Sequence, residues 1–435
     1  MTTPRSRVRI PFAAWPLLVP IALFAAMAAL YLSGALGLYF AALRGWGIIP
    51  YPWPFVDTDT VMSALRCLRK GVDVYAANPC DPERRPFDYS PLWMALSVFP
   101  VTKAWIAPTG LAIDLGFLAA LFLLPRVRDR RAAVLMTLGT VSSGVVFALE
   151  RGNNDLILFV LGAGAAALLL AGWGRRRLGY ALLFLAGLLK FYPMLTMALA
   201  LRERPGRFAA LTLLSCAGLG AFLAITWPDL SRVLAIIPTG TPFGDMFGSI
   251  VVALGLTKLV GLPDGAVPLV RLAMIAFSLT GALVMGLQGE THRALAALTA
   301  RERSFLLVGA LLTIACFFTA QNIGYRVIHL LLALPALLAL RAFAPSLRFR
   351  WMPGAVLLSL WGEAWRNHGP TLGRYVFGSE GVASLSLWLA KEGVWWFLVT
   401  VLAAYLVAFA RHSAMGAWLA ARLGVPAPAP SFAAD

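Results

Sequence analysis

Charged residues are scarce in this chain, and acidic ones are the scarcer kind. Only 13% of the 435 residues are charged, with 20 acidic residues against 37 lysines and arginines, while 60% are hydrophobic. Such a composition excludes a soluble globular domain, because it leaves too little polar surface to cover a folded core in water. It predicts a protein that crosses the membrane several times.

The signature motifs of several enzyme classes are also absent from the sequence. There is no Walker A sequence, HExxH, paired CxxC, GxSxG, or GxGxxG at a strand-to-helix turn. The sequence therefore gives no indication of ATP-driven or metal-dependent hydrolytic chemistry. We expect neither a cofactor nor a bound metal.

The basic residues that produce the net charge of +17 fall in short clusters between apolar runs, not along one face. This distribution is typical of cytoplasmic loops under the positive-inside rule, and it argues against a nucleic-acid partner. We therefore expect these clusters and both termini on the cytoplasmic side. The clusters are Arg5/Arg7/Arg9, Arg126/Arg128/Arg130/Arg131, Arg175/Arg176/Arg177, Arg202/Arg204/Arg207, Arg293/Arg301/Arg303 and Arg341/Arg348/Arg350.

Long apolar runs without strand-like alternation predict an all-α polytopic membrane protein of about ten spans plus a re-entrant hairpin. We treat 1–425 as one membrane domain and 426–435 as a disordered tail. An external loop is expected from 228 to about 268, and an interfacial helix that ends at Lys391 is expected before the last span. The predicted spans cover about 11–43, 104–124, 132–149, 156–173, 208–227, 269–287, 305–319, 327–340, 352–361 and 394–410.

The first external loop, 43–90, is the most acidic part of the chain, with six of the 20 acidic residues. Asp57 and Asp59 flank Thr58 just after the aromatic sequence YPWPFV. A carboxylate held at the membrane surface can act as a general base on an acceptor hydroxyl. Either aspartate can instead cap the helix predicted to follow, TVMSALRCLRKG.

The same loop contains a second polar sequence and two cysteines. In FDYSP, Asp88 and Tyr89 precede the next apolar run and can either line a cavity or form a simple turn. If the loop lies outside the cytoplasm, Cys67 and Cys80 can form a disulfide, and the alternative is two free thiols.

Lys190 interrupts an apolar stretch, LAGLLKFYPML, that has basic clusters at both ends. A single span cannot satisfy the charge rule at both ends, and a lysine inside the membrane is costly. The following Tyr192-Pro193 also disfavours a continuous helix. We predict two short half-helices with Lys190 at the tip, where the ammonium can bind a lipid phosphate or can instead snorkel to the membrane surface.

Two further polar sequences lie next to predicted spans. In ERGNNDL, the residues Asn153, Asn154 and Asp155 form either a cavity wall or an ordinary turn. In NIGYRVIHLL, Arg326 and His329 are three residues apart and so share a helix face, which suits a donor phosphate. Interfacial anchoring is the alternative for Tyr325 and Arg326.

Taken in order, these sequences resemble glycosyltransferase family 87, a bacterial membrane family with the GT-C fold. The resemblance rests on Asp57, on the spaced Ala64, Leu68, Gly71, Val74 and Tyr75, and on FDYSPL, GNND, LLKFYPML and NIGYRVIHLL, from about Asp57 to Pro335. It implies a hexosyltransferase of the bacterial cytoplasmic membrane. Such an enzyme moves mannose or a related sugar from a polyprenyl phosphate to a glycolipid or glycan acceptor on the outer face.

The resemblance also implies roles for single residues. Asp57 matches the catalytic base, with Asp59 as a close competitor, and Lys190, Arg326 and His329 match contacts to the donor phosphate. The cavity and acceptor residues would be Asp88, Tyr89, Asn153, Asn154, Asp155, Tyr192 and Tyr325. Because the acidic pair of metal-dependent GT-C enzymes is not clear beyond Asp57 and Asp59, we expect an inverting, metal-independent reaction. The rival hypothesis is a transporter or flippase of lipids or small molecules.

Overall fold

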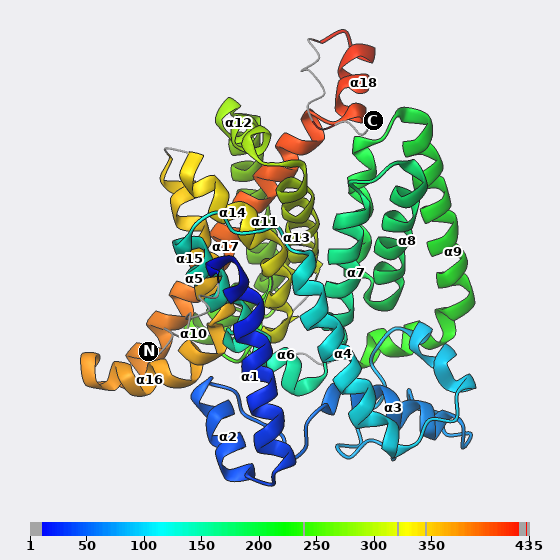
Figure 1. The fold of residues 1–435 in the computed structure, drawn as a ribbon, viewed down its shortest axis with the longest axis vertical. Helices are drawn as coiled ribbons and strands as arrows, with labels where there is room; N and C mark the ends of the chain where they lie inside the picture. Colours follow the sequence, from blue (N-terminus) through cyan, green and yellow to red (C-terminus); the bar gives the residue numbers. More distant parts are fainter. Residues whose placement is uncertain (1–10, 238–239, 320–321, 344–345, 426–431, 433–435) are drawn as a thin grey trace, which may run out of the picture.

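The computed structural model describes residues 11–237, 240–319, 322–343, 346–425 and 432, and it is almost entirely helical (Figure 1). The predicted 426–435 tail lies outside the described residues apart from Phe432. One short antiparallel pair joins β1 (Met246–Phe247) to β2 (Asn322–Ile323). The α-helices are α1 (Trp15–Leu32), α2 (Leu36–Gly45), α3 (Val56–Leu68), α4 (Ile106–Ala120), α5 (Arg130–Thr140), α6 (Ser143–Arg151), α7 (Asn154–Leu168), α8 (Trp173–Lys190), α9 (Pro205–Ile236), α10 (Val251–Val260), α11 (Ala266–Leu287), α12 (Gly289–Ala297), α13 (Ala300–Thr319), α14 (Leu330–Phe343), α15 (Leu347–Leu360), α16 (Gly362–Phe377), α17 (Glu380–Arg411) and α18 (Ala414–Arg422). The 3-10 helices are η1 (Phe12–Ala14), η2 (Pro91–Val98), η3 (Lys103–Trp105), η4 (Leu121–Leu123), η5 (Tyr192–Arg202) and η6 (Gly324–His329).

The prediction of an all-α chain with several membrane-length helices is confirmed. Within the described residues, eight helices are long and apolar enough to cross a membrane. Two of the predicted spans are shorter helices, α7 with 15 residues and α15 with 14. At about 1.5 Å per residue, neither reaches the roughly 30 Å of a bilayer core.

The first predicted span, 11–43, is wrong as a single helix. The helix α1 ends at Leu32, the chain reverses at Gly34, and α2 follows from Leu36. Gly34 has a φ of 76°, the left-handed conformation that ends many helices and that glycine adopts without strain.

Two predictions in the second half also need correction. The expected loop 228–268 is largely helical, because α9 continues through Pro228 to Ile236 and α10 occupies Val251–Val260. The expected interfacial helix ends at Gly378, where φ is 68°, and Lys391 instead lies within the continuous helix α17. The Ser379 side chain accepts a hydrogen bond from the backbone N–H of Val382 and so starts that new helix.

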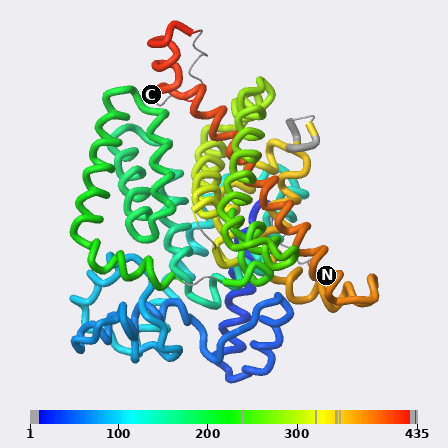
Figure 2. The backbone as a smooth tube through the Cα atoms, turned by 180° about the vertical axis from the view of Figure 1, so that it is seen from behind, coloured from blue at the N-terminus to red at the C-terminus, as the bar shows by residue number. Residues whose placement is uncertain are grey.

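The helices differ sharply in how much of their surface the protein covers. In α13, 83% of the most apolar 18-residue stretch is buried, whereas none of the corresponding stretch of α9 is. Figures 1 and 2 place α9 at one edge of the bundle. The centre of the bundle is therefore built around α13 and α14, and α9 has the exposed apolar surface of a lipid-facing helix.

The acidic segment forms a lobe at one end of the bundle (Figures 1 and 2). We call residues 51–105 the α3 lobe. It has a small core of its own, which includes Leu65, Tyr75 and Phe87, and a disulfide joins Cys67 to Cys80. At the opposite end of Figure 1 lie α12 and α18. Two of the basic clusters are joined by an ion pair: Arg128 of one cluster pairs at 2.5 Å with Glu302, which lies between Arg301 and Arg303 of the other.

The predicted reversal at Lys190 is present, but the prediction of two short half-helices is wrong for the first limb, since α8 has 18 residues. The helix α8 ends at Lys190, Phe191 has a φ of 59°, and η5 runs back against α8. A Cβ atom at Gly187 would lie 3.1 Å from the backbone N and Cα atoms of Met194, so glycine at this position favours the close return. Whether this hairpin re-enters the membrane stays a prediction.

Candidate functional site

Asp155, near the start of α7, is the centre of a buried polar cluster. Its side chain is fully buried, and Lys190 donates a hydrogen bond to its Oδ2 atom at 2.5 Å. The Tyr192 hydroxyl donates to the other carboxylate oxygen at 2.7 Å. Arg326 lies 3.4 Å from Oδ2, and His329 lies 3.7 Å from Oδ1. We call these five residues the Asp155 cluster.

The short 3-10 helix η6 is what brings Arg326 and His329 to the same carboxylate. Residues three apart eclipse one another in 3-10 geometry, so the prediction that the two share a face is confirmed. His329 Nε2 lies 2.6 Å from the Tyr192 hydroxyl. Because that hydroxyl has one proton and gives it to Asp155, His329 must donate from Nε2 to the tyrosine oxygen.

The charges of the Asp155 cluster do not cancel. Two basic side chains, Lys190 and Arg326, contact one carboxylate, and a protonated His329 would add a third positive charge. The formal charge of the cluster is therefore positive, which suits an anion. Asp155 itself, predicted to line a cavity, is instead buried beneath the cations and orients them.

Asn153 connects this cluster to Asp57. Its side-chain oxygen accepts from the backbone N–H of Asp155 at 2.8 Å and so caps α7. Its side-chain nitrogen donates to Asp57 Oδ2 at 2.5 Å. The turn interpretation of the GNND sequence is thus correct, and the same turn also orients the candidate base. Asn154 is buried beside it, and its amide nitrogen has no hydrogen-bond partner among the described residues.

The start of α3 is fixed by the chain around Gly152, not by a carboxylate cap. Phe55, with a φ of 65°, precedes the helix, and its N–H donates to the Glu150 carbonyl at 2.8 Å. Thr58 donates to the Gly152 carbonyl, also at 2.8 Å. The capping alternative for Asp57 and Asp59 is therefore wrong, since both lie inside the first turn, where carboxylates favour the helix dipole.

Asp59 faces away from Asp57, into a different environment. It pairs with Arg66 at 3.5 Å and lines a largely apolar cavity of about 730 Å³ between α1 and α4. Asp114 and Glu150 line the same cavity, and with Asp59 they outnumber its lysine, Lys103, which makes it a poor place for a phosphate. Burial raises the pKa of the Asp59 carboxyl above its usual value, although Arg66 opposes the shift.

The FDYSP sequence lies over the tip of the α8 hairpin. The Ser90 hydroxyl donates to the Leu188 carbonyl at 2.7 Å, and the Lys190 ammonium lies 5.5 Å from the centre of the Tyr89 ring. Burial raises the pKa of Asp88, against the lowering effect of Lys190 and Arg85. Asp88 and Tyr89 therefore lie near Lys190, as a shared site requires.

Tyr325 completes the connection between η6 and Asp57. Its ring packs edge-on against Phe147, with ring centres 5.4 Å apart, and its side chain lies close to Asn153. Eight of the predicted residues thus form one continuous contact network: Asp57, Asn153, Asp155, Lys190, Tyr192, Tyr325, Arg326 and His329. Asp59 lies beside this network but outside it.

A polar cavity of about 430 Å³ escaped the sequence analysis. It lies between α6, α16 and the segments around Tyr51 and Asp245, with Arg151, Glu363 and Arg366 in its walls. Of these residues, Arg151 belongs to the polar ERGNNDL sequence next to a predicted span. The sequence signal available for Glu363 and Arg366 was their spacing, because a carboxylate and an arginine three residues apart can pair on one helix face.

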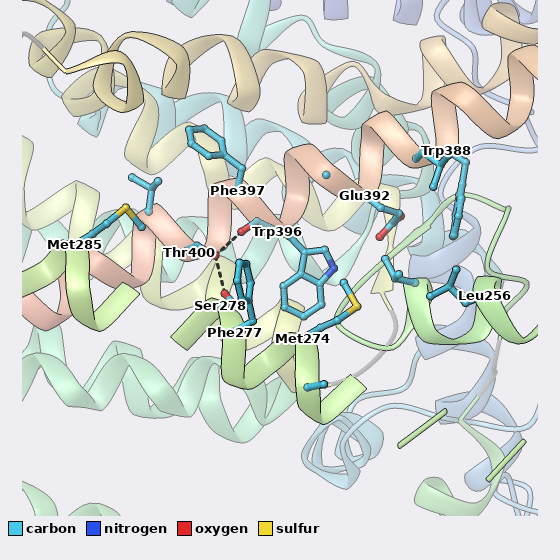
Figure 3. A pocket seen from close by; sticks show the side chains of 15 residues that line it. Leu256, Met274, Phe277, Ser278, Met285, Trp388, Glu392, Trp396, Phe397 and Thr400 are labelled. Atoms are coloured by element: carbon cyan, nitrogen blue, oxygen red, sulfur yellow. Dashed lines mark hydrogen bonds between the residues drawn. The ribbon is translucent and has the colours of Figure 1, made fainter. Parts of the chain in front are cut away.

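A mostly apolar cavity of about 690 Å³ lies between α10, α11 and α17 (Figure 3). Met274, Phe277 and Trp396 project into it, and Glu392, which pairs with Lys391 at 3.3 Å, is its charged residue. None of the predicted site residues lines this cavity. It is therefore separate from the Asp155 cluster.

No group of three or more histidine, cysteine, aspartate or glutamate side chains with the arrangement of a metal site occurs among the described residues. Comparison with protein-family models, with curated proteins and with solved structures finds no match to this chain.

Proposed function

We propose that the chain is a membrane glycosyltransferase that moves a sugar from a polyprenyl phosphate to a glycolipid or glycan acceptor, on the outer face of the bacterial cytoplasmic membrane. One observation carries the proposal. A buried carboxylate, Asp57, is joined through Asn153 to a cluster of two cations and a histidine. Transfer from a sugar phosphate needs these two parts, a base for the acceptor and positive charge for the leaving group.

The reaction divides between the two parts as follows. The acceptor hydroxyl oxygen attacks the anomeric carbon of the donor, and Asp57 takes the hydroxyl proton. The bond between the anomeric carbon and the phosphate oxygen breaks, and the electron pair leaves with the polyprenyl phosphate. Lys190 and Arg326 stabilise the charge that builds up on that phosphate, while Asp155 holds both side chains in position. Attack from the face opposite the leaving group inverts the sugar carbon.

The geometry favours Asp57 over Asp59 as the base. Asp57 is joined through Asn153 to the Asp155 cluster, whereas Asp59 faces the acidic, largely apolar cavity and pairs with Arg66. Of the two aspartates, therefore, Asp57 is the one that is joined to the Asp155 cluster.

The decisive test compares Asp57→Asn with Asp59→Asn in membranes supplied with polyprenyl-phosphate mannose and an extract of the host's glycolipids. Loss of a general base lowers the rate by about 100- to 10,000-fold. We expect that loss for Asp57→Asn at equal protein levels, with most activity retained in Asp59→Asn. Full transfer by Asp57→Asn would overturn the assignment of the base.

The same membranes separate an enzyme from a transporter. A transferase consumes the lipid donor and leaves free polyprenyl phosphate, whereas a flippase changes the leaflet of the lipid and leaves it intact. Mass spectrometry of lipids from cells with and without the chain would also identify the acceptor and the sugar. An unchanged set of glycolipids together with an altered leaflet distribution would favour the transporter.

A further inference from the structure

The polar cavity beside α6 has the chemistry of a carbohydrate site. Its volume of about 430 Å³ falls within the range of small-molecule pockets, roughly 300–1,000 Å³. Its walls combine aromatic surface from Tyr51 and Phe147 with charged hydrogen-bonding groups from Arg151, Glu363 and Arg366. A neutral, hydroxyl-rich ligand can use both kinds of surface, since hydroxyls donate to carboxylates and accept from guanidinium groups.

The charge of this cavity differs from that of the Asp155 cluster. Three acids, Glu83, Asp245 and Glu363, line it against two arginines, so its formal charge is negative. A phosphate would be repelled there and attracted to Lys190 and Arg326. The two places therefore suit two different ligands, an uncharged sugar and an anionic donor.

The walls of the cavity are held in position before any ligand arrives. Glu363 is buried and accepts hydrogen bonds from Arg366, the shorter at 2.8 Å. Arg151 lies over the Tyr51 ring, 4.3 Å from its centre, and pairs with Glu150 at 3.2 Å. Such fixed donors and acceptors bind a ligand without first having to be ordered.

Gly324 permits the approach of Glu363 to η6. A Cβ atom at that position would lie 2.1 Å from Glu363 Oε1, closer than any real contact. The glycine of the NIGYR sequence thus lets the carboxylate lie directly against the helix that carries Arg326. The cavity and the Asp155 cluster are therefore neighbours, separated by the η6 backbone and Tyr325.

Asp57 is connected to both the cavity and the cluster. Asn153 bonds to Asp57 and, through the Asp155 N–H, to the cluster. Arg151, two residues before Asn153 in the chain, lies in the cavity wall. An acceptor held in the cavity and a phosphate held at the cluster would therefore both lie near Asp57, the proposed base.

We infer that this cavity binds the acceptor sugar as a neutral carbohydrate, with the reacting hydroxyl directed toward Asp57. The inference rests on the proposed glycosyltransferase function, because it assigns one substrate of that reaction.

The test uses the full chain in lipid nanodiscs and the near-isosteric variant Glu363→Gln. Glu392→Gln is the matched control, since Glu392 is also a buried glutamate paired with a nearby cation, but it lies in the separate cavity of Figure 3. In transfer assays we expect Glu363→Gln to raise the KM for the acceptor about tenfold, equivalent to about 1.4 kcal/mol, and to leave the KM for the donor unchanged. Unchanged acceptor KM in Glu363→Gln, or an equal increase in both variants, would overturn the inference.

Direct binding distinguishes this failure from failure of the proposed function. Saturation-transfer NMR with methyl α-mannoside and methyl β-glucoside should show signals that weaken in Glu363→Gln and persist in Glu392→Gln, and glucuronate should bind more weakly than either. If glycosides bind in this way but no donor is consumed, the carbohydrate cavity stands and the transferase proposal fails. If transfer occurs but binding does not depend on Glu363, the transferase stands and the cavity inference fails.

Discussion

Two buried carboxylates in this molecule are surrounded by similar side chains, but they differ in where those side chains come from. Asp155 contacts Lys190, Tyr192, Arg326 and His329. Glu203, also fully buried, contacts Arg176 at 3.3 Å, Tyr180 at 3.0 Å and Arg207 at 3.8 Å. We call these four residues the Glu203 cluster.

The Glu203 cluster is local. Arg176 and Tyr180 are 27 and 23 residues from Glu203 in the chain, Arg207 is one helical turn away, and together they fasten the turn between η5 and α9. The Asp155 cluster instead joins segments 137 residues apart and is bonded through Asn153 to a second carboxylate. A buried ion pair alone is weak grounds for assigning function. Convergence of distant segments on two linked carboxylates is stronger grounds.

The largest expected difference comes from neutralising each central acid. Asp155→Asn and Glu203→Gln each leave a buried cation unpaired, so each should lower the free energy of unfolding by about 3–5 kcal/mol. We expect only Asp155→Asn to lower kcat/KM per folded molecule as well, by about 100-fold, because only Asp155 orients the cations at the proposed phosphate site. Thermal unfolding and initial rates on the folded fraction measure the two effects separately. Similar losses of kcat/KM in both variants would remove the distinction between the clusters.

The tyrosines of the two clusters provide a smaller version of the same comparison. Tyr192→Phe and Tyr180→Phe each remove one buried hydroxyl, at a cost of about 1 kcal/mol in stability. Tyr192 also hydrogen-bonds to His329 at 2.6 Å, so its loss should slow transfer about tenfold and shift the pH dependence of kcat/KM, as expected when a hydrogen bond to an ionisable group is lost. Tyr180→Phe should leave both the rate and the pH profile as they are. A changed pH profile in Tyr180→Phe would show that the Glu203 cluster affects the chemistry.

Asp59 offers the smallest and most local test. Burial raises the pKa of Asp59 in the folded protein, so its charged form destabilises the fold at high pH. This destabilisation declines as the pH falls toward the usual pKa of about 4. The wild-type protein should therefore lose stability as the pH rises above about 4, and Asp59→Asn should lose less. Melting curves across that range check the effect. A variant whose stability follows the same pH curve as the unmodified chain would contradict it.

Features that depend on composition or on neighbouring residues could be predicted from the sequence. The helical membrane class follows from the apolar runs, the reversal at Lys190 from the lysine and the following proline, and the shared face of Arg326 and His329 from their spacing. The helix break at Gly34 was missed because apolar residues continue on both sides of it, and composition alone does not reveal the φ that a glycine adopts.

The parts of the site that sequence analysis missed depend on contacts between distant segments. Nothing local in GNND indicates that Asn153 bonds to Asp57, 96 residues earlier in the chain. The burial of Asp155 beneath two cations likewise depends on how α7, α8 and η6 pack together. Glu363 and Arg366 form a visible pair in the sequence, but their place in a cavity wall depends on α6 and on the segment around Tyr51.

The two-stranded pairing of β1 with β2 connects the proposed acceptor cavity to the proposed phosphate site. The Asp245 carbonyl, in the wall of the polar cavity, accepts from the N–H of Gly324 at 2.7 Å, and Arg326 follows two residues later. A ligand that displaces Asp245 would therefore also shift the backbone that carries Arg326, the arginine proposed to bind the donor phosphate. If occupancy of the cavity changes donor affinity by some factor, the donor must change acceptor affinity by that same factor. The order in which the substrates bind would then reflect rates alone, since the free energy of the ternary complex is the same by either route.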